Sequence, residues 1–149
     1  MLTEPNIDKK VIKAKIEESY GINITNLTHV IGGEASWGYK VETEKETFFF
    51  KIHIMLEEYK LRFDLTYRLF NNCGIKNITH PIKNKKGELI FYLDKYPAAL
   101  FNFISGSNAS KSELNNDQCF ALGKLLGQVH KAKETIGDVF TEESIPRKF

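Results

Sequence analysis

The segment that most constrains this chain is VIGGEASWGYKVETEKETFFFKIHI, which begins at Val30 and ends at Ile54. Aromatic and β-branched residues favour strands, so the pattern predicts strands over residues 39–43 and 47–54 with the polar turn EKE between them. A short apolar run at 27–31 predicts one more strand before the glycines. Gly32 and Gly33 then predict a small turn, because glycine has no Cβ to restrict the backbone.

One charged residue, Lys51, interrupts the strongest of these strands, between Phe50 and Ile52. A buried lysine is costly unless an anion pairs with it. Two phosphates and a carboxylate would satisfy it, and a glycine-rich hairpin can bring backbone N–H groups close to a phosphate, with the Ser36 hydroxyl as a further donor. This combination is the phosphate grip of protein-kinase-like folds. The alternative is an ordinary hairpin whose lysine head reaches water.

Apolar spacing predicts three helices. The first is capped by Asp8 and ended by Gly21, the second covers residues 56–72, and the third begins near Asn115 with Gln118 at the capping-box position. Apolar runs at 78–82 and 89–93 predict two strands joined by a hairpin turn at NKKG, residues 84–87, and a further run covers 99–104. This order favours an α+β fold: an antiparallel sheet of about five strands with helices packed on one side.

Composition excludes several classes of protein. The 149 residues carry a formal net charge of +2, which argues against nucleic acid as the main partner. The N-terminus lacks an apolar signal core and no apolar stretch reaches transmembrane length, so we expect a cytoplasmic protein with no membrane partner. Cys73 and Cys119 lie in apolar helical patterns without zinc-ligand spacing, so we expect two packed, reduced thiols.

Five stretches resemble, in order, the aminoglycoside phosphotransferase and choline-kinase-like family, and within it the spectinomycin phosphotransferases. The stretches are VIGGEASWGYKVET, FFFKIHI, YRLFNNCGIKNITHPI, LFNFISGSNAS and LGKLLGQVHKAKET. They match the family's nucleotide loop, lysine strand, helix end with its following strand, lobe linker and leucine-rich helix. The resemblance spans roughly residues 5–135. It implies a protein-kinase-like N-terminal lobe over residues 1–104, and over 105–149 the linker and first helix of a C-terminal lobe.

The resemblance also implies an ATP site. Lys51 would bind the phosphates, and Gly32, Gly33 and Ser36 would lie over them. The side chains of Ile31 and Phe49 would line the adenine pocket. The backbone of Asn102, Phe103 and Ile104 would meet the adenine edge. The helix carboxylate that would hold the lysine is Glu57, Glu58 or Asp64. Glu58 is preferred for its longer side chain near the helix start. For Glu57 and Glu58 the alternative is a charge that interacts with the helix dipole.

The catalytic motif of the family, similar to H-x-D-x-x-x-x-N, does not occur in these 149 residues. None of the four histidines is followed two residues later by aspartate. We therefore expect the ATP-binding half of a small-molecule O-phosphotransferase of the antibiotic-resistance type, truncated before the catalytic loop and inactive alone. Magnesium and the contacts to an aminoglycoside-like, spectinomycin-like or choline-like acceptor would come from the other half.

Two further expectations concern partners. The third helix has apolar residues on one face, and one lobe would bury them only in part against the sheet, so we expect self-association through this helix: Leu122, Leu125, Leu126 and Val129. The alternative to the kinase interpretation is a small non-enzymatic α+β binding or interaction module in which Lys51 has no functional role.

Overall fold

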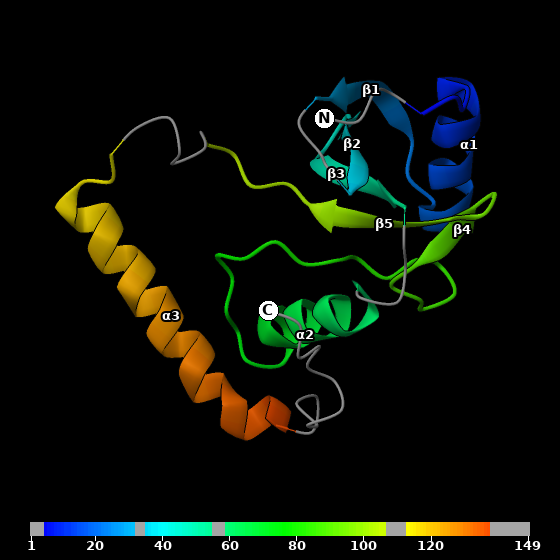
Figure 1. The fold of residues 1–149 in the computed structure, drawn as a ribbon. Coiled ribbons are helices and arrows are strands. Elements are labelled where there is room, and N and C mark those ends of the chain that lie inside the picture. Colours follow the sequence, from blue (N-terminus) through cyan, green and yellow to red (C-terminus); the bar gives the residue numbers. More distant parts are fainter. Residues whose placement is uncertain (1–4, 32–34, 55–58, 107–112, 138–149) are drawn as a thin grey trace.

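The structure is a computed structural model that describes residues 5–31, 35–54, 59–106 and 113–137. Its elements, in chain order, are α1 (Lys9–Tyr20), β1 (Ile24–Val30), β2 (Ser36–Thr43), β3 (Thr47–His53), α2 (Tyr59–Asn71), β4 (Phe91–Leu93), β5 (Tyr96–Asn102) and α3 (Asn116–Ile136). The strands form one antiparallel five-stranded sheet in the order β1-β2-β3-β5-β4 (Figure 1). The predicted α+β class is confirmed. No described helix is long and apolar enough to cross a membrane.

The central strand β3 gives the sheet its two different faces. Successive side chains of a strand point to opposite faces. Phe50 and Ile52 are fully buried in the core under α1, where they meet Ile12 and Ile16 of that helix. On the opposite face, Phe63 of α2 packs against β5 and β3. Because both faces carry apolar residues, each face is covered by a helix, and the expectation that the helices share one side is wrong.

The predicted helix ends follow local capping chemistry. The Asp8 carboxylate accepts a hydrogen bond from the Lys10 N–H at 2.8 Å, and Gly21 ends α1 in the left-handed conformation with φ 70°. At α3, the Asn115 side chain accepts from the Gln118 N–H at 2.9 Å, and the Gln118 side chain accepts from the Asn115 N–H at 3.0 Å. The predicted capping box is therefore present.

The predicted hairpin between residues 78–82 and 89–93 is wrong. The Asn84–Gly87 turn exists, with the Gly87 N–H donating to the Asn84 carbonyl at 2.9 Å, but it does not join two paired strands. Residues 78–82 instead follow the edge of β5, where Pro81 makes a single bridge to Phe101. Proline has no N–H to extend a ladder. The hairpin partner of β5 is β4, across a turn at Asp94, whose φ is 56°.

Tyr20 completes the edge of β5 beyond the short strand β4. The Leu100 N–H donates to the Tyr20 hydroxyl oxygen at 3.1 Å, while the Leu100 carbonyl accepts from the Ile82 N–H at 2.8 Å. Burial raises the pKa of Tyr20 to about 12. Its ring also contacts Phe91 edge-on, at 5.8 Å between centroids. A side chain at the end of α1 thus replaces a missing strand partner.

The helix α3 extends away from the sheet and packs at its C-terminal end near α2 (Figure 1). Buried side chains from both helices and the segment between α2 and β4 form one apolar cluster, made of Leu69, Ile75, Ala132 and Ile136. Leu125 and Val129 are half-buried against this cluster, not against the sheet as expected. Phe120, Leu122 and Leu126 are exposed.

The two cysteines have different surroundings. Both thiols are free, and Cys73 is half-buried at the cluster between α2 and α3. Cys119 is exposed, so the expectation of two packed thiols holds for Cys73 only. Cys119 lies in the first turns of α3, where all the described side chains are exposed.

Replacing Tyr20 with phenylalanine tests the contact that completes β5. Tyr20→Phe keeps the ring packing but leaves a buried backbone N–H without its acceptor, which costs about 1–3 kcal/mol of unfolding free energy. Urea unfolding followed by circular dichroism measures this loss. The matched control is Tyr92→Phe, because Tyr92 lies on β4 and is 53% exposed. Equal stability of the two variants would show that the hydroxyl does not support the strand.

Candidate functional site

The face of the sheet opposite α1 carries Phe49 and Lys51, two of the residues that the family resemblance assigned to a nucleotide. We call it the lysine face, because Phe49, Lys51 and His53 of β3 share it. In the strand register, Lys51 lies opposite Gly38 of β2 on one side and Ala99 of β5 on the other. Its neighbours across the sheet are therefore a glycine and an alanine, the two smallest residues.

Lys51 itself is half-buried and lies close to aromatic rings. Its Nζ is 5.6 Å from the ring centroid of Phe49 and 5.6 Å from that of Phe101. Both distances are within the range of a cation–π interaction, which attracts the ammonium to the ring faces. Burial lowers the pKa of Lys51. The amine is thus partly desolvated, and an anionic partner at this position would stabilise its charged form.

The carboxylate predicted to hold Lys51 is not identified. Asp64 forms its ion pair within α2, with 2.8 Å between its Oδ2 and Arg68 Nε. Among the described carboxylates, none makes an ion pair with Lys51. Glu57 and Glu58 lie outside the described residues, and the preferred pairing of Lys51 with Glu58 stays a prediction.

The loop residues are placed only in part. Gly32 and Gly33 lie outside the described residues. Ser36 begins β2, is half-buried and lies opposite His53 of β3. Ile31 comes directly after β1 and is 72% exposed. Val30 lies opposite Gly38 and so shares the lysine face, a position that sequence reasoning missed and that only the strand register gives.

The side chain of Asn102, the last residue of β5, joins the end of this strand to residues 78–80. The Oδ1 atom of Asn102 accepts from the His80 N–H at 2.7 Å, and its Nδ2 atom donates to the Ile78 carbonyl at 3.1 Å. Sequence reasoning assigned only the backbone of Asn102 to a ligand and missed this role. Phe103 and Ile104 follow the strand without regular secondary structure, and both residues are exposed.

A hollow of about 600 Å³ lies at this end of the sheet. It includes two of the predicted adenine-edge residues but not the lysine, and its lining is Lys40, Glu46, Thr47, Phe48, Ile82, Asn102, Phe103 and Ser105. In the part of the chain that the structure describes, no group of three or more histidine, cysteine, aspartate or glutamate side chains is placed to hold a metal ion.

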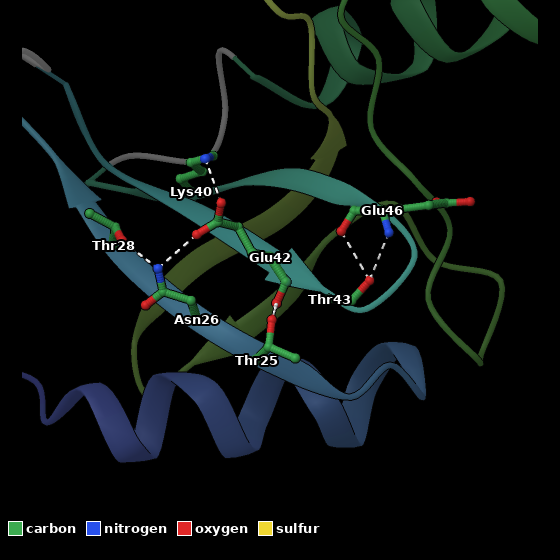
Figure 2. Close-up of polar contacts among 7 residues, drawn as sticks. All are labelled: Thr25, Asn26, Thr28, Lys40, Glu42, Thr43 and Glu46. Carbon is green, nitrogen blue, oxygen red and sulfur yellow. Dashed lines mark hydrogen bonds and ion pairs between the residues drawn. The ribbon is translucent and has the colours of Figure 1, made fainter.

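A polar network crosses β1 and β2 on the lysine face itself, where Lys40 and Glu42 lie opposite Phe49 and Thr47 of β3 (Figure 2). Lys40 Nζ lies 2.5 Å from a Glu42 carboxylate oxygen, and the other oxygen of Glu42 accepts from Asn26 Nδ2 at 2.7 Å. Lys40 also lies 5.8 Å from the Phe103 ring centroid. These contacts give β1 and β2 a polar surface next to the hollow. No sequence motif predicted this surface.

His53 is the most strongly shifted acid–base group on the lysine face. It is 3% exposed, and its ring lies 5.2 Å from that of Phe63. Burial, together with the positive charge of Lys51, lowers the pKa of His53 to about 4. The ring is therefore neutral at pH 7 and acts as packing between β3 and α2.

Comparison with solved structures finds kinases. A crystal structure of spectinomycin phosphotransferase APH(9)-Ia, in complex with ADP and spectinomycin, matches with a TM-score of 0.74 and 25% identity, over 85% of this chain and 39% of that chain. The AMP-bound complex of the same enzyme matches with a TM-score of 0.70, 24% identity and 84% and 38% coverage. A microcompartment-associated aminopropanol kinase matches with a TM-score of 0.59, 15% identity and 84% and 40% coverage.

Comparison by sequence gives a weaker likeness to the same kind of enzyme. Homoserine kinase from Parvibaculum lavamentivorans (strain DS-1 / DSM 13023 / NCIMB 13966) is 29% identical over 103 residues, which is 67% of this chain and 31% of that protein. No protein-family model matches the chain.

The fold defines the class: the five-stranded antiparallel sheet and its helices match the kinase-like N-terminal lobe of these structures. The chain resembles the aminoglycoside phosphotransferase and choline-kinase-like family, and spectinomycin phosphotransferase is among its structural relatives, as the sequence predicted. The chain spans 38–40% of the length of these solved structures and 31% of the homoserine kinase.

Acidification should destabilise the fold through His53. In the unfolded chain this ring has an ordinary pKa near 6.5, so between about pH 6.5 and 4 the unfolded state binds the extra proton. The unfolding free energy should therefore fall by up to about 3 kcal/mol as the pH drops through this window. Urea unfolding at several pH values measures the slope.

The variant His53→Phe is the control for that slope, because it removes the titrating group and keeps a buried ring. Its stability should depend less steeply on pH. Some dependence should remain, because burial also lowers the pKa of His80. An unchanged slope in His53→Phe would show that His53 is not the group responsible.

Proposed function

We propose that this chain binds ATP on its lysine face and serves as the nucleotide-binding lobe of a small-molecule O-phosphotransferase. The observation that carries the proposal is Lys51: a half-buried amine on the third strand of a kinase-like lobe, held between the rings of Phe49 and Phe101. The solved relatives support it, because spectinomycin phosphotransferase binds ADP and AMP.

In this proposal each part of the face has one task. The Lys51 ammonium donates hydrogen bonds to phosphate oxygens and offsets their charge, which also satisfies the partly desolvated amine. Ser36 and the backbone of the glycine turn, Gly32 and Gly33, add donors over the phosphates. The base lies against the apolar side chains of this face, and the backbone at Phe103 and Ile104 binds its edge.

Transfer of the γ-phosphoryl group requires parts that these residues do not supply. Magnesium, when bound, would neutralise charge on the phosphates, and a carboxylate would accept the proton of the acceptor hydroxyl. We propose that both come from residues beyond this sequence, together with the contacts to an aminoglycoside-like or spectinomycin-like alcohol. The 149-residue chain alone would then transfer no phosphate, and measured transfer by the purified chain would contradict this.

Removing the amine of Lys51 tests nucleotide binding. Lys51→Ala should weaken binding of ATP with magnesium by about tenfold or more, because a charge-assisted contact to phosphate is lost. Isothermal titration calorimetry measures the affinity. The control is Lys45→Ala, which removes an exposed lysine from the β2–β3 turn of the same hairpin. Equal affinities, or no binding by the original chain, would favour the non-enzymatic interaction module.

We also propose that the chain self-associates through α3. The exposed apolar side chains Phe120, Leu122 and Leu126 lie on this helix, and such surfaces usually bind a partner. Leu126→Glu should shift the chain toward monomer at high concentration without changing the sheet, as measured by sedimentation velocity. The control, Gln128→Glu, adds the same charge at an exposed polar position. A monomeric original chain at high concentration would contradict the proposal.

A further inference from the structure

Gly38 is an unexpected residue for the place it occupies. It lies in the interior of β2, is buried, and is opposite Lys51 in the register. Glycine weakens a strand, because it has no side chain to pack and loses more backbone entropy than other residues. Gly38 is not among the described glycines with positive φ, so backbone freedom does not explain it. A glycine in a strand also occurs where another group approaches the backbone closely.

That group is the ring of Phe49. A Cβ added to Gly38 would lie 2.7 Å from Phe49 Cζ, 3.4 Å from Cε1 and 3.5 Å from Cε2. The cross-strand partner of Phe49 is Lys40, so its ring extends diagonally across β2 and its tip covers the bare backbone of Gly38. The missing Cβ therefore allows the ring to lie close against the sheet.

The ring has little freedom to move sideways. On its β5 side Phe49 packs against a cluster that contains Phe63, Ala99 and Phe101. A methyl group at position 38 would push a rigid ring away from the sheet and out into the space above the lysine face. The same ring lies 5.6 Å from Lys51 Nζ, so the displacement would occur where the proposed nucleotide binds.

We propose that Gly38 is a specificity-determining position that acts through Phe49: it keeps the ring flat so that a nucleobase can stack on it. A purine has a π-face that stacks on aromatic side chains, whereas a bare polyphosphate does not. Gly38 is then a positioning residue for the base, and Lys51 is the contact for the phosphates. This inference rests on the proposed function and concerns binding of the base, whereas Lys51 concerns binding of the phosphates.

The test compares a ligand with a base and a ligand without one. ATP and inorganic tripolyphosphate, each with magnesium, are titrated by calorimetry into the original chain and into Gly38→Ala. Loss of base stacking should weaken ATP binding to Gly38→Ala by about tenfold or more. Tripolyphosphate binding should change little, because the lysine is intact. The single variant Phe49→Leu should weaken ATP binding to a similar degree, and the double variant Gly38→Ala/Phe49→Leu should bind ATP no more weakly than Phe49→Leu, because the base has no ring to stack on in either variant.

The controls separate this role from a purely structural one. Gly127→Ala, on α3 with open space around the added Cβ, should bind both ligands as the original chain does. Thermal unfolding shows whether each variant is folded during the titrations. If Gly38→Ala weakens the binding of both ligands equally, or of neither, the proposed role of Gly38 is overturned while the proposed function stands. An original chain that binds neither ligand would overturn the proposed function as well, so the two failures are distinguishable.

Discussion

The two-sided character of β3 is the constraint on which the rest of the structure depends. Neighbouring residues of a strand face opposite ways, so Phe50 and Ile52 enter the core under α1 while Phe49 and Lys51 must lie on the other face. A register shift of one residue would bury the lysine amine among the core isoleucines, at a large desolvation cost. The same alternation that builds the core therefore fixes where the charge can be.

The surroundings of Lys51 show how a strand lysine is retained in a largely apolar sheet. The residues opposite it are Gly38 and Ala99, whose small size lets aromatic rings pack close to the sheet, and two aromatic rings lie at cation–π distance from the amine. Burial disfavours the charged amine, as its lowered pKa indicates, while the rings favour it. Such a balance leaves the amine available to an anion, which is the physical basis for regarding this face as a ligand site.

The two ends of the chain differ in how completely they are packed. The α1 helix joins the sheet both through its buried isoleucines and through the Tyr20 hydroxyl, which replaces a strand partner for Leu100. The α3 helix is buried mainly near its C-terminal end, through Ala132 and Ile136, and its first turns are exposed. The sheet with α1 thus has its own core, and α3 adds a second, smaller one with α2.

Sequence alone determined the features that depend on local chemistry. Residue types at short spacing predicted the hairpin that places Lys51 on β3, and this hairpin is present. They also predicted the helix caps at Asp8 and Asn115 and the end of α1 at Gly21, which are present as well. The family resemblance was likewise readable from the order of motifs, and a solved spectinomycin phosphotransferase matches the chain with 25% identity.

Only the tertiary structure decided which distant segments meet. Residues 78–82 look like a strand, but Pro81 cannot donate to a ladder, and β5 pairs with β4 instead. Three further features depend on which segments are neighbours and in what register they pair. They are the hydrogen bonds of the Asn102 side chain to residues 78 and 80, the contact of the Phe49 ring with Gly38, and the position of Val30 on the lysine face. Periodicity shows that a residue faces one side of its own strand; it carries no information about the residue on the next strand, because the free energy of that contact depends on packing across the whole sheet.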